Sequence, residues 1–441
     1  MNSQPKDRGA INPVAARQAA TASFIGSAIE WYDFFLYGAA AALIFAPQYF
    51  PSSNPAASQL GSFASFAVGF LTRPLGGVIA GHFGDRIGRK KVLVISLVMM
   101  GGSTVLVGLL PSYAQIGVAA PILLFVLRLI QGLAVGAEWG GAALMAIEHA
   151  PPNRRTFYGS ATQLGVPAGA VFAYGMMLVL SEFAGEGFDH WGWRVAFVAS
   201  IVLVGYGFRI RRRLSESPLF TETVSEKDVA RAPILEVLRR YPGHVLTAVF
   251  AATASPAIGY IVLTYILSYG TKEVGYTRNT LLIVVIVTSA VQFVATLVLT
   301  LMADRWGRRR LMLIGSAFQA VAALAFFPIF DTGVVAFAIV GCSLAIVANT
   351  TQYAPLPAVI SDLFPTRLRY TGSSIGYQFG AILGGALSPI IATSIYAGTG
   401  NSVYIGLYLA AVTVLSAVAI LIAHLPALRP READPEPELV G

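Results

Sequence analysis

Apolar runs alternate with short polar turns along nearly the whole chain. Each run is about 20 residues long, the length that an α-helix needs to cross the roughly 30 Å hydrocarbon core of a bilayer. Turn-forming residues such as Pro51, Pro111 and the Pro242-Gly243 pair separate the runs. The pattern predicts twelve membrane-spanning helices, at residues 21–46, 60–82, 92–111, 119–145, 156–180, 194–213, 244–270, 280–303, 311–330, 334–360, 371–397 and 402–425.

The composition also indicates a membrane protein. Hydrophobic residues make up 56% of the chain and charged residues only 12%, whereas a soluble chain usually carries about twice that charge. The single cysteine, Cys342, excludes a disulfide framework and a cysteine-based metal site. The stretch Gly372-Ser-Ser-Ile-Gly376 matches a hydrolase nucleophile pattern, but it opens a predicted membrane helix and has no triad partners nearby. We therefore expect neither an enzyme nor a metalloprotein.

Lys and Arg are concentrated in every second predicted loop, and Lys272 and Arg278 are the main exceptions. The positive-inside rule then places both termini on the cytoplasmic side of the plasma membrane, the inner membrane of a bacterial cell. The net charge of +8 is thus a topology signal, and we expect no nucleic-acid partner. The basic clusters are Arg86/Arg89/Lys90/Lys91, Arg154/Arg155, Arg209–Arg213, Arg305/Arg308–Arg310 and Arg367/Arg369.

Two loop motifs recur at a similar offset. Asp85-Arg86-Ile-Gly-Arg89 returns as Asp304-Arg305-Trp-Gly-Arg308, 219 residues later (304 − 85). Glu148-x-x-Pro-x-x-x-Arg155 returns as Asp362-x-x-Pro-x-x-x-Arg369, 214 residues later (362 − 148). Two similar halves predict an all-α membrane protein with twelve transmembrane helices in two pseudo-symmetric six-helix bundles that meet at a central cavity.

The repeat divides the chain into five parts. The central loop contains Pro233-Ile-Leu-Glu-Val-Leu-Arg-Arg240, an amphipathic pattern that fits either a helix on the membrane surface or a solvated linker. The parts are a cytosolic N-terminal segment (1–20), an N-terminal six-helix bundle (21–213), a cytosolic central loop (214–243), a C-terminal six-helix bundle (244–426) and a disordered cytosolic tail (427–441).

Several motifs resemble the major facilitator superfamily over essentially the whole chain. The turn at Gly81–Lys90 is similar to its loop between helices 2 and 3, and Arg128-x-x-Gln131-Gly resembles its helix 4 motif. Glu30-Trp-Tyr-Asp33-Phe and Gly136-Ala-Glu138-Trp-Gly-Gly resemble the metabolite:proton symporter family within it. That family includes permeases for shikimate, citrate, 2-oxoglutarate, proline and betaine.

The resemblance implies the major facilitator fold and proton-coupled transport by a monomer. The partners are then a small-molecule substrate, the proton and the lipid bilayer, and the proton gradient supplies the driving force without a cofactor. It also implies that the repeated loop motifs gate the cytoplasmic side. The gating candidates are Asp85, Arg86, Arg89, Glu148, Arg155, Asp304, Arg305, Asp362 and Arg369.

Glu30, Asp33, Arg73, Arg128 and Glu138 fall inside predicted spans, where a charge costs on the order of 3 kcal/mol. They must therefore face each other or water. We predict that Asp33, Glu30 and Glu138 take part in proton coupling and that Arg128 and Arg73 bind substrate. Burial favours the neutral acid and a nearby guanidinium favours the carboxylate, so a substrate that engages Arg128 would release Asp33 to take a proton. The alternative is that these charges only hold helices 1, 2 and 4 together.

Polar and aromatic residues complete the predicted site. Tyr37 and Gln131 share the faces of Asp33 and Arg128 at helical spacing. The C-terminal half offers hydroxyl and amide groups in place of charges, and ordinary interhelical hydrogen bonding explains each of them equally well. We expect substrate contacts from Asn349, Gln352 and Tyr377, in a cavity also lined by Tyr260, Tyr265, Tyr353 and Gln378.

Together these features predict proton-driven import of a small organic acid, shikimate-like or another carboxylate metabolite, by alternating access. Helix 5 has Gly165-Val-Pro-Ala-Gly169 and lacks the element typical of antiporters of the superfamily, which favours import. The alternative is proton-coupled uptake of a zwitterionic osmolyte such as proline or betaine, for which an aromatic cage around the amine is expected.

Overall fold

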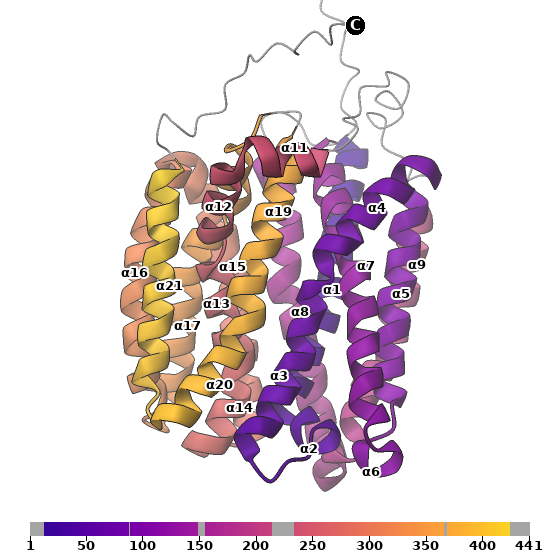
Figure 1. The fold of residues 1–441 in the computed structure, drawn as a ribbon, viewed down its shortest axis with the longest axis vertical. Helices are drawn as coiled ribbons and strands as arrows, with labels where there is room; N and C mark the ends of the chain where they lie inside the picture. The colour runs from indigo at the N-terminus through magenta and orange to yellow at the C-terminus, as the bar shows by residue number, and fades with distance from the viewer. Residues whose placement is uncertain (1–12, 88, 149–154, 214–232, 366–367, 424–441) are drawn as a thin grey trace, which may run out of the picture.

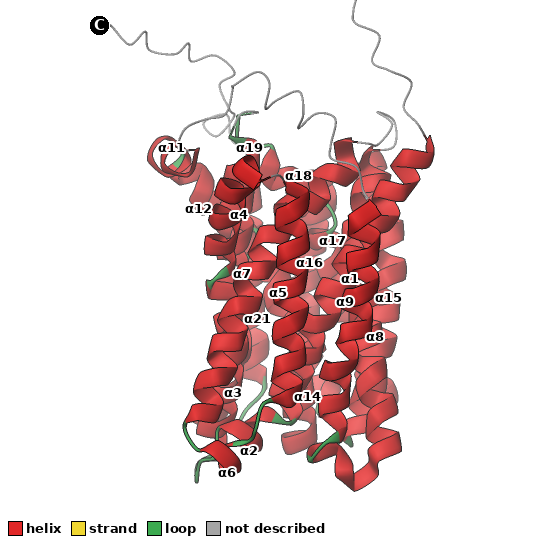
Figure 2. Cartoon of the chain, turned by 90° about the vertical axis from the view of Figure 1, so that its right-hand side faces the viewer, coloured by secondary structure: helices red, strands yellow, loops and turns green. Residues whose placement is uncertain are grey.

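The computed structural model describes residues 13–87, 89–148, 155–213, 233–365 and 368–423. In these ranges the chain is helical and contains no strand (Figures 1 and 2). The helices run side by side between two ends of the molecule (Figure 1). We call them the α11 end, which carries α11 (Pro233–Arg240), and the α6 end, which carries α6 (Tyr113–Ile116). Nine helices in the described ranges are long and apolar enough to cross a membrane by themselves.

The N-terminal half contains six spans, the second of which is interrupted at Thr72. Two short helices, α2 (Phe45–Tyr49) and η2 (Gly185–Asp189), join spans at the α6 end. The spans are α1 (Pro13–Leu43), α3 (Pro55–Leu71) with α4 (Arg73–Ile87), α5 (Arg89–Leu109), α7 (Ala119–Glu148), α8 (Arg155–Ala184) and α9 (Gly192–Arg213).

The C-terminal half also contains six spans, and two of them include π-helical turns. Such turns insert one residue into a helix and are often found at functional sites. The first span consists of α12 (Pro242–Ala251), α13 (Ala254–Tyr260), η3 (Ile261–Tyr265), α14 (Ile266–Tyr269) and η4 (Gly270–Val274). The others are α15 (Arg278–Trp306), α16 (Arg308–Phe330), α17 (Val335–Tyr353) with α18 (Leu356–Ser361), α19 (Arg369–Ala381) with η5 (Ile382–Ala386) and α20 (Leu387–Thr399), and α21 (Val403–Ile422).

The two halves have the same internal packing. In the N-terminal half α1 packs on α8, α5 on α9 and α4 on α7; in the C-terminal half the corresponding spans do the same, with α12 on α19, α16 on α21 and α15 on α17. The halves meet where α8 packs on α15 and where α3 packs on α20, two contacts that a two-fold rotation exchanges. This arrangement confirms the predicted fold of two pseudo-symmetric six-helix bundles.

Small residues let helices pack backbone against backbone near the centre. A Cβ atom added at Gly136 of α7 would lie 1.9 Å from the carbonyl oxygen of Arg73, and one at Gly76 of α4 would lie 2.0 Å from that of Leu133. In the C-terminal half, a Cβ at Gly384 would lie 2.0 Å from the carbonyl oxygen of Thr253. Close packing of this kind is common between membrane helices, and here it fixes where Arg73 enters the interior.

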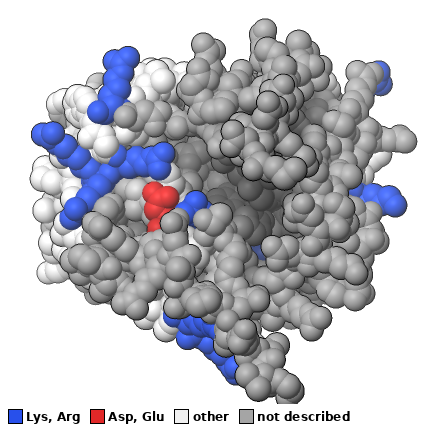
Figure 3. Space-filling view, turned by 90° about the horizontal axis from the view of Figure 1, so that it is seen from above, with Lys and Arg blue, Asp and Glu red and all other residues white. Residues whose placement is uncertain are grey.

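The predicted amphipathic segment of the central loop is the helix α11, which lies across the α11 end above α12 and α19 (Figure 1). Val237 is fully buried in a cluster with α12 and α19 residues, whereas Leu235 and Leu238 are exposed. Basic side chains are prominent on the described part of this end (Figure 3).

Candidate functional site

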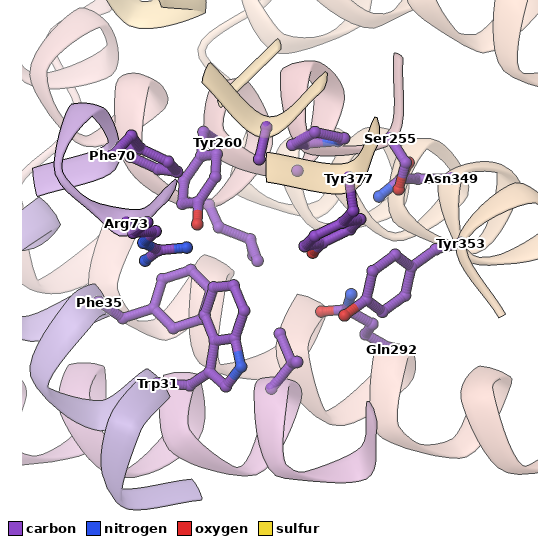
Figure 4. A pocket seen from close by; sticks show the side chains of 15 residues that line it. Trp31, Phe35, Phe70, Arg73, Ser255, Tyr260, Gln292, Asn349, Tyr353 and Tyr377 are labelled. Carbon is purple, nitrogen blue, oxygen red and sulfur yellow. The ribbon is translucent and has the colours of Figure 1, made fainter. Parts of the chain in front are cut away.

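A cavity lies between the two halves (Figure 4). Both halves contribute to its walls, so a movement of one half against the other would reshape it. From the N-terminal half it is lined by Trp31, Phe35, Phe70, Arg73 and Val166, and from the C-terminal half by Ser255, Pro256, Gly259, Tyr260, Leu263, Gln292, Asn349, Tyr353, Tyr377 and Ala381.

Arg73 supplies the positive charge of this cavity wall. It begins α4 directly after the interruption at Thr72, and its side chain is 4% exposed. The guanidinium carbon lies 4.3 Å from the ring centre of Phe34 and 4.6 Å from that of Phe70. Its Nε has no hydrogen-bond partner among the described residues. A guanidinium has five N–H donors in a planar fork, so this one retains the capacity to bind a carboxylate.

Tyr260 extends from the C-terminal half into an aromatic cluster of the N-terminal half. Its ring centre lies 5.4 Å from that of Phe70, 5.5 Å from that of Phe66 and 5.7 Å from that of Phe34. Its hydroxyl has no hydrogen-bond partner in the described part of the chain and points toward Arg73 (Figure 4). Gly385 in η5 leaves the room for this ring, because a Cβ there would lie 2.7 Å from it. The cavity thus has a second polar group next to the guanidinium.

Hydroxyl and amide groups form the opposite wall (Figure 4). Tyr353 and Tyr377 hydrogen-bond to each other, and the Glu30 carboxylate is close enough to interact electrostatically with both. Asn349 accepts a hydrogen bond from Gln319 at 3.4 Å, and Gln292 Oε1 has no partner among the described residues. This wall can donate to or accept from a hydroxylated substrate.

Arg128 does not line the cavity. It is 2% exposed and lies behind the aromatic cluster, with its guanidinium carbon 4.0 Å from the ring centre of Tyr37, 4.5 Å from that of Phe34 and 5.3 Å from that of Phe66. Phe34 therefore contacts both guanidinium groups. Gly69 makes room for Arg128, because a Cβ at that position would lie 2.5 Å from its Nε.

A chain of hydrogen bonds joins Arg128 to Asp33. Arg128 donates to the Gln131 oxygen at 3.2 Å, and the Gln131 amide nitrogen donates to the Thr104 hydroxyl at 2.7 Å. The Thr104 hydroxyl donates to Asp33 Oδ2 at 2.8 Å. Asp33 is 3% exposed and Thr104 is fully buried, so this chain lies in the interior of the N-terminal half.

Polar contacts join the two halves at the α6 end. Lys272 donates to Gln59 at 2.7 Å, and Arg278 forms an ion pair with Asp189 at 2.5 Å. In addition, Asn279 donates to Glu182 and accepts from Ser181. We call this set the α6-end clamp; it consists of Gln59, Ser181, Glu182, Asp189, Lys272, Arg278 and Asn279.

The predicted gating residues lie around the α11 end, and most of their side chains fall outside what the structure describes. Arg305 is exposed in the last turn of α15. Among the described residues Asp362 forms an ion pair with Arg308 at 3.8 Å, whereas the repeated loop motif pairs it with Arg369. Arg369 is half-buried. The gating side chains not described are those of Asp85, Arg86, Arg89, Glu148, Arg155 and Asp304. The side chain of Glu138, predicted to take part in proton coupling, is also not described.

The structure separates the other predicted site residues into two groups. Arg73, Asn349 and Tyr377 line the cavity. Gln352 does not line it: this residue is fully buried and donates to Ser316 at 3.2 Å inside the C-terminal half. Tyr37 is also fully buried and donates to Ser65 at 2.9 Å. Gln131 belongs to the hydrogen-bond chain of Arg128, and Glu30 lies near the cavity but outside its lining.

The family model and the relatives found by comparison with known proteins agree with one another. Residues 23–389 match the family model described as Major Facilitator Superfamily. The chain is 41% identical to the inner membrane metabolite transport protein YhjE of Escherichia coli (strain K12), over 93% of this chain and 95% of the relative. It is 39% identical to the shikimate transporter of the same strain (94% and 96% covered) and 31% identical to its proline/betaine transporter (96% and 87% covered).

Among solved structures, the chain is similar to a crystal structure of a D-xylose-proton symporter. The TM-score is 0.72 at 17% identity, with 93% of this chain and 97% of the other chain covered. At this identity the similarity supports the fold alone.

Proposed function

Because the chain belongs to the Major Facilitator Superfamily, we propose that it imports a small organic acid together with protons. The family is one of membrane transporters, which also confirms the expectation that the chain is not an enzyme. The observation that carries the proposal is the guanidinium of Arg73, the one charged group among the described residues that line a cavity shared by both halves. Substrate bound there would bridge the halves, and alternating access would carry it across the membrane.

The chemistry of the cavity favours a carboxylate attached to a ring or a hydroxylated body. Arg73 binds the carboxylate, and the Tyr260 hydroxyl, which has no partner among the described residues, supplies an adjacent donor. Trp31 and Phe35 provide flat apolar contacts, while Tyr353 and Tyr377 provide hydroxyl groups. Because Arg128 is enclosed behind aromatic rings, one strong anion site faces the substrate, and a monocarboxylate matches it better than a tricarboxylate.

For orientation, we propose that the α11 end faces the cytosol. Exposed arginines such as Arg239, Arg240 and Arg309 gather there, as the positive-inside rule requires. The α6-end clamp then closes the periplasmic side, and the described arrangement is a state closed to the outside. The relative named an inner membrane protein supports placement in that membrane. Since one chain supplies both walls of the cavity, we expect the monomer to be sufficient.

The alternative substrate is a zwitterionic osmolyte. The aromatic residues Trp31, Tyr260, Tyr353 and Tyr377 surround the cavity and would interact favourably with a quaternary amine, while Arg73 would bind its carboxylate. The relative named a proline/betaine transporter supports this option. Both options use the same guanidinium and differ in the group that faces the aromatic residues.

Uptake into proteoliposomes with an imposed inward proton gradient tests the proposal. The labelled panel is shikimate, benzoate, citrate, 2-oxoglutarate, proline and betaine, each with and without an uncoupler. Uncoupler-sensitive accumulation of a carboxylic acid supports the proposal, and accumulation of proline or betaine alone supports the alternative. Accumulation of none of the panel would contradict both. Arg309→Gln, an exposed arginine of the α11 end, serves as the matched control for Arg73→Gln.

A further inference from the structure

We propose that Thr104 is a positioning residue whose hydroxyl transmits the protonation of Asp33 to Arg128. This inference rests on the proposed proton coupling and deepens it. Thr104 lies at the centre of the hydrogen-bond chain that joins Arg128 to Asp33. Among the described residues, its hydroxyl has three hydrogen-bonding neighbours: Gln131 Nε2 at 2.7 Å, Asp33 Oδ2 at 2.8 Å and the Met100 carbonyl oxygen at 3.0 Å.

The direction of each hydrogen bond follows from the groups at the two ends. Arg128 can only donate, so the oxygen of the Gln131 amide faces it and the amide nitrogen faces Thr104. The Thr104 hydroxyl therefore accepts from Gln131 and has one proton left to donate. Two acceptors are within reach of that proton, the Asp33 carboxylate and the Met100 carbonyl one helical turn away.

With Asp33 ionised, the proton points to the carboxylate, because a charged acceptor makes the stronger hydrogen bond. All donors in the chain then point from Arg128 toward Asp33, and bonds aligned in this way strengthen one another. The guanidinium is held at one end and the carboxylate is stabilised at the other.

When Oδ2 of Asp33 takes a proton, that oxygen becomes a donor. The Thr104 hydroxyl then accepts from both Asp33 and Gln131, and its own proton turns to the Met100 carbonyl. No heavy atom has to move. However, the series of aligned hydrogen bonds now ends at Thr104, and the hydrogen bonds that position Arg128 become weaker. Thr104 thus has two arrangements, and the proton on Asp33 selects between them.

Described charged or titratable groups near this hydrogen-bond chain lie on α1, α4 and α7. Arg128 on α7 interacts electrostatically with Asp33 and with Arg73 on α4. On α1 itself Tyr32 is next to Asp33, but its hydroxyl donates to the Ala196 carbonyl of α9 at 3.1 Å. On α5, the Thr104 hydroxyl contacts the Asp33 carboxylate.

The test compares Thr104→Val, which keeps the volume and removes the hydroxyl, with Thr104→Ser, which keeps the hydroxyl. Full-length carriers in proteoliposomes are assayed with the acid of the panel that the wild type accumulates. We expect Thr104→Val to lower gradient-driven accumulation by about 10-fold or more, the effect of one lost charge-assisted hydrogen bond, while exchange without a gradient stays near the wild-type rate. Thr104→Ser should keep both activities.

A second measurement needs no substrate. Infrared difference spectra of the purified carrier between two pH values report protonated buried carboxyl groups, and Asp33→Asn identifies the band of Asp33. In Thr104→Val the pH midpoint of that band should shift by about one pH unit, and in Thr104→Ser it should not. An unchanged midpoint and coupling in Thr104→Val, or equal losses in both variants, would overturn the role of Thr104. Failure of the wild type to accumulate any acid would instead overturn the proposed function and leave the infrared comparison to decide the inference.

Discussion

Replacing Gly69 by Ala should displace the Arg128 guanidinium. The added Cβ would lie 2.5 Å from Nε, 3.0 Å from Cζ and 3.1 Å from Cδ of Arg128. The distance to Nε is shorter than any normal contact of a Cβ atom, and the distance to Cζ is at the limit. The Arg128 side chain must therefore shift. It has little freedom to do so, because Phe34, Tyr37 and Phe66 surround it and Gln131 accepts from it at 3.2 Å.

Overpacking of this kind typically costs about 1–3 kcal/mol, and we expect Gly69→Ala to fall in that range. The displaced guanidinium should also lose its hydrogen bond to Gln131, so gradient-driven uptake should fall by about 10-fold, equivalent to about 1.4 kcal/mol. Thermal unfolding of the purified carrier and uptake into proteoliposomes measure the two effects separately.

Gly102→Ala is the matched control, because nothing lies within 4 Å of a Cβ added at Gly102 in α5. It should stabilise the helix by up to about 1 kcal/mol and leave uptake unchanged. Combining Gly69→Ala with Arg128→Lys, which removes the planar group, should give less than the sum of the two losses in stability. If Gly69→Ala and Gly102→Ala behaved alike in both assays, the packing around Arg128 would not be as described.

Two further substitutions test the proton site and the α6-end clamp. Asp33→Asn should abolish accumulation driven by the gradient and preserve substrate exchange, because the neutral amide cannot take up a proton; uncoupler-sensitive accumulation by this variant would contradict the assignment. Asp189→Arg should favour opening of the α6 end, measured by labelling of a cysteine introduced at Trp31 in a Cys342→Ser background, and adding Arg278→Asp should restore the closed state. Because the Asp189–Arg278 pair is partly exposed, its loss is worth about 0–1 kcal/mol, and the expected change in labelling rate is at most about fivefold. Equal labelling in the single and double variants would show that this pair does not hold the halves together.

The twelve spans and the two similar halves could be predicted from the sequence, because both leave a repeated signal along the chain. Apolar runs give the spans, and the recurrence of the Asp85 and Asp304 motifs gives the two halves. The interruption at Thr72 and the π-helical turns η3 and η5 could not be predicted, since they depend on contacts across the bundle such as that between Gly385 and Tyr260.

The candidate site, too, could be predicted only in part from the sequence. A single rule identifies Arg73, Asp33 and Arg128 as site residues: a charge inside a membrane span is costly and therefore indicates a functional role. The rule does not show whether a charged side chain reaches the cavity, and Arg128, expected to contact substrate, is enclosed behind aromatic rings. Gln352, expected in the cavity as an uncharged polar group, instead donates to Ser316 inside the C-terminal half. The role of Thr104 could not be predicted from the sequence, because an uncharged threonine is common in membrane helices and its neighbours are known only from the structure.

The α6-end clamp had a weak signal in the sequence. Lys272 and Arg278 lie among predicted loops that otherwise contain almost no Lys or Arg, and each contacts the other half of the chain. Their partners Gln59 and Asp189 carry no pattern that points to them, because the pairing is set by how the two halves meet. A charge that departs from the topology rule is therefore informative about contacts between the halves.

The binding of a carboxylate by Arg73 is tested most directly by competition between an acid and its methyl ester. In wild-type proteoliposomes, the unlabelled acid should inhibit uptake of the labelled acid, and the ester, which has the same body without the negative charge, should inhibit it far more weakly. In Arg73→Gln, acid and ester should inhibit equally and weakly, while Arg309→Gln should behave as the wild type. Equal inhibition by acid and ester in the wild type, or a preserved preference for the acid in Arg73→Gln, would contradict a carboxylate site at Arg73.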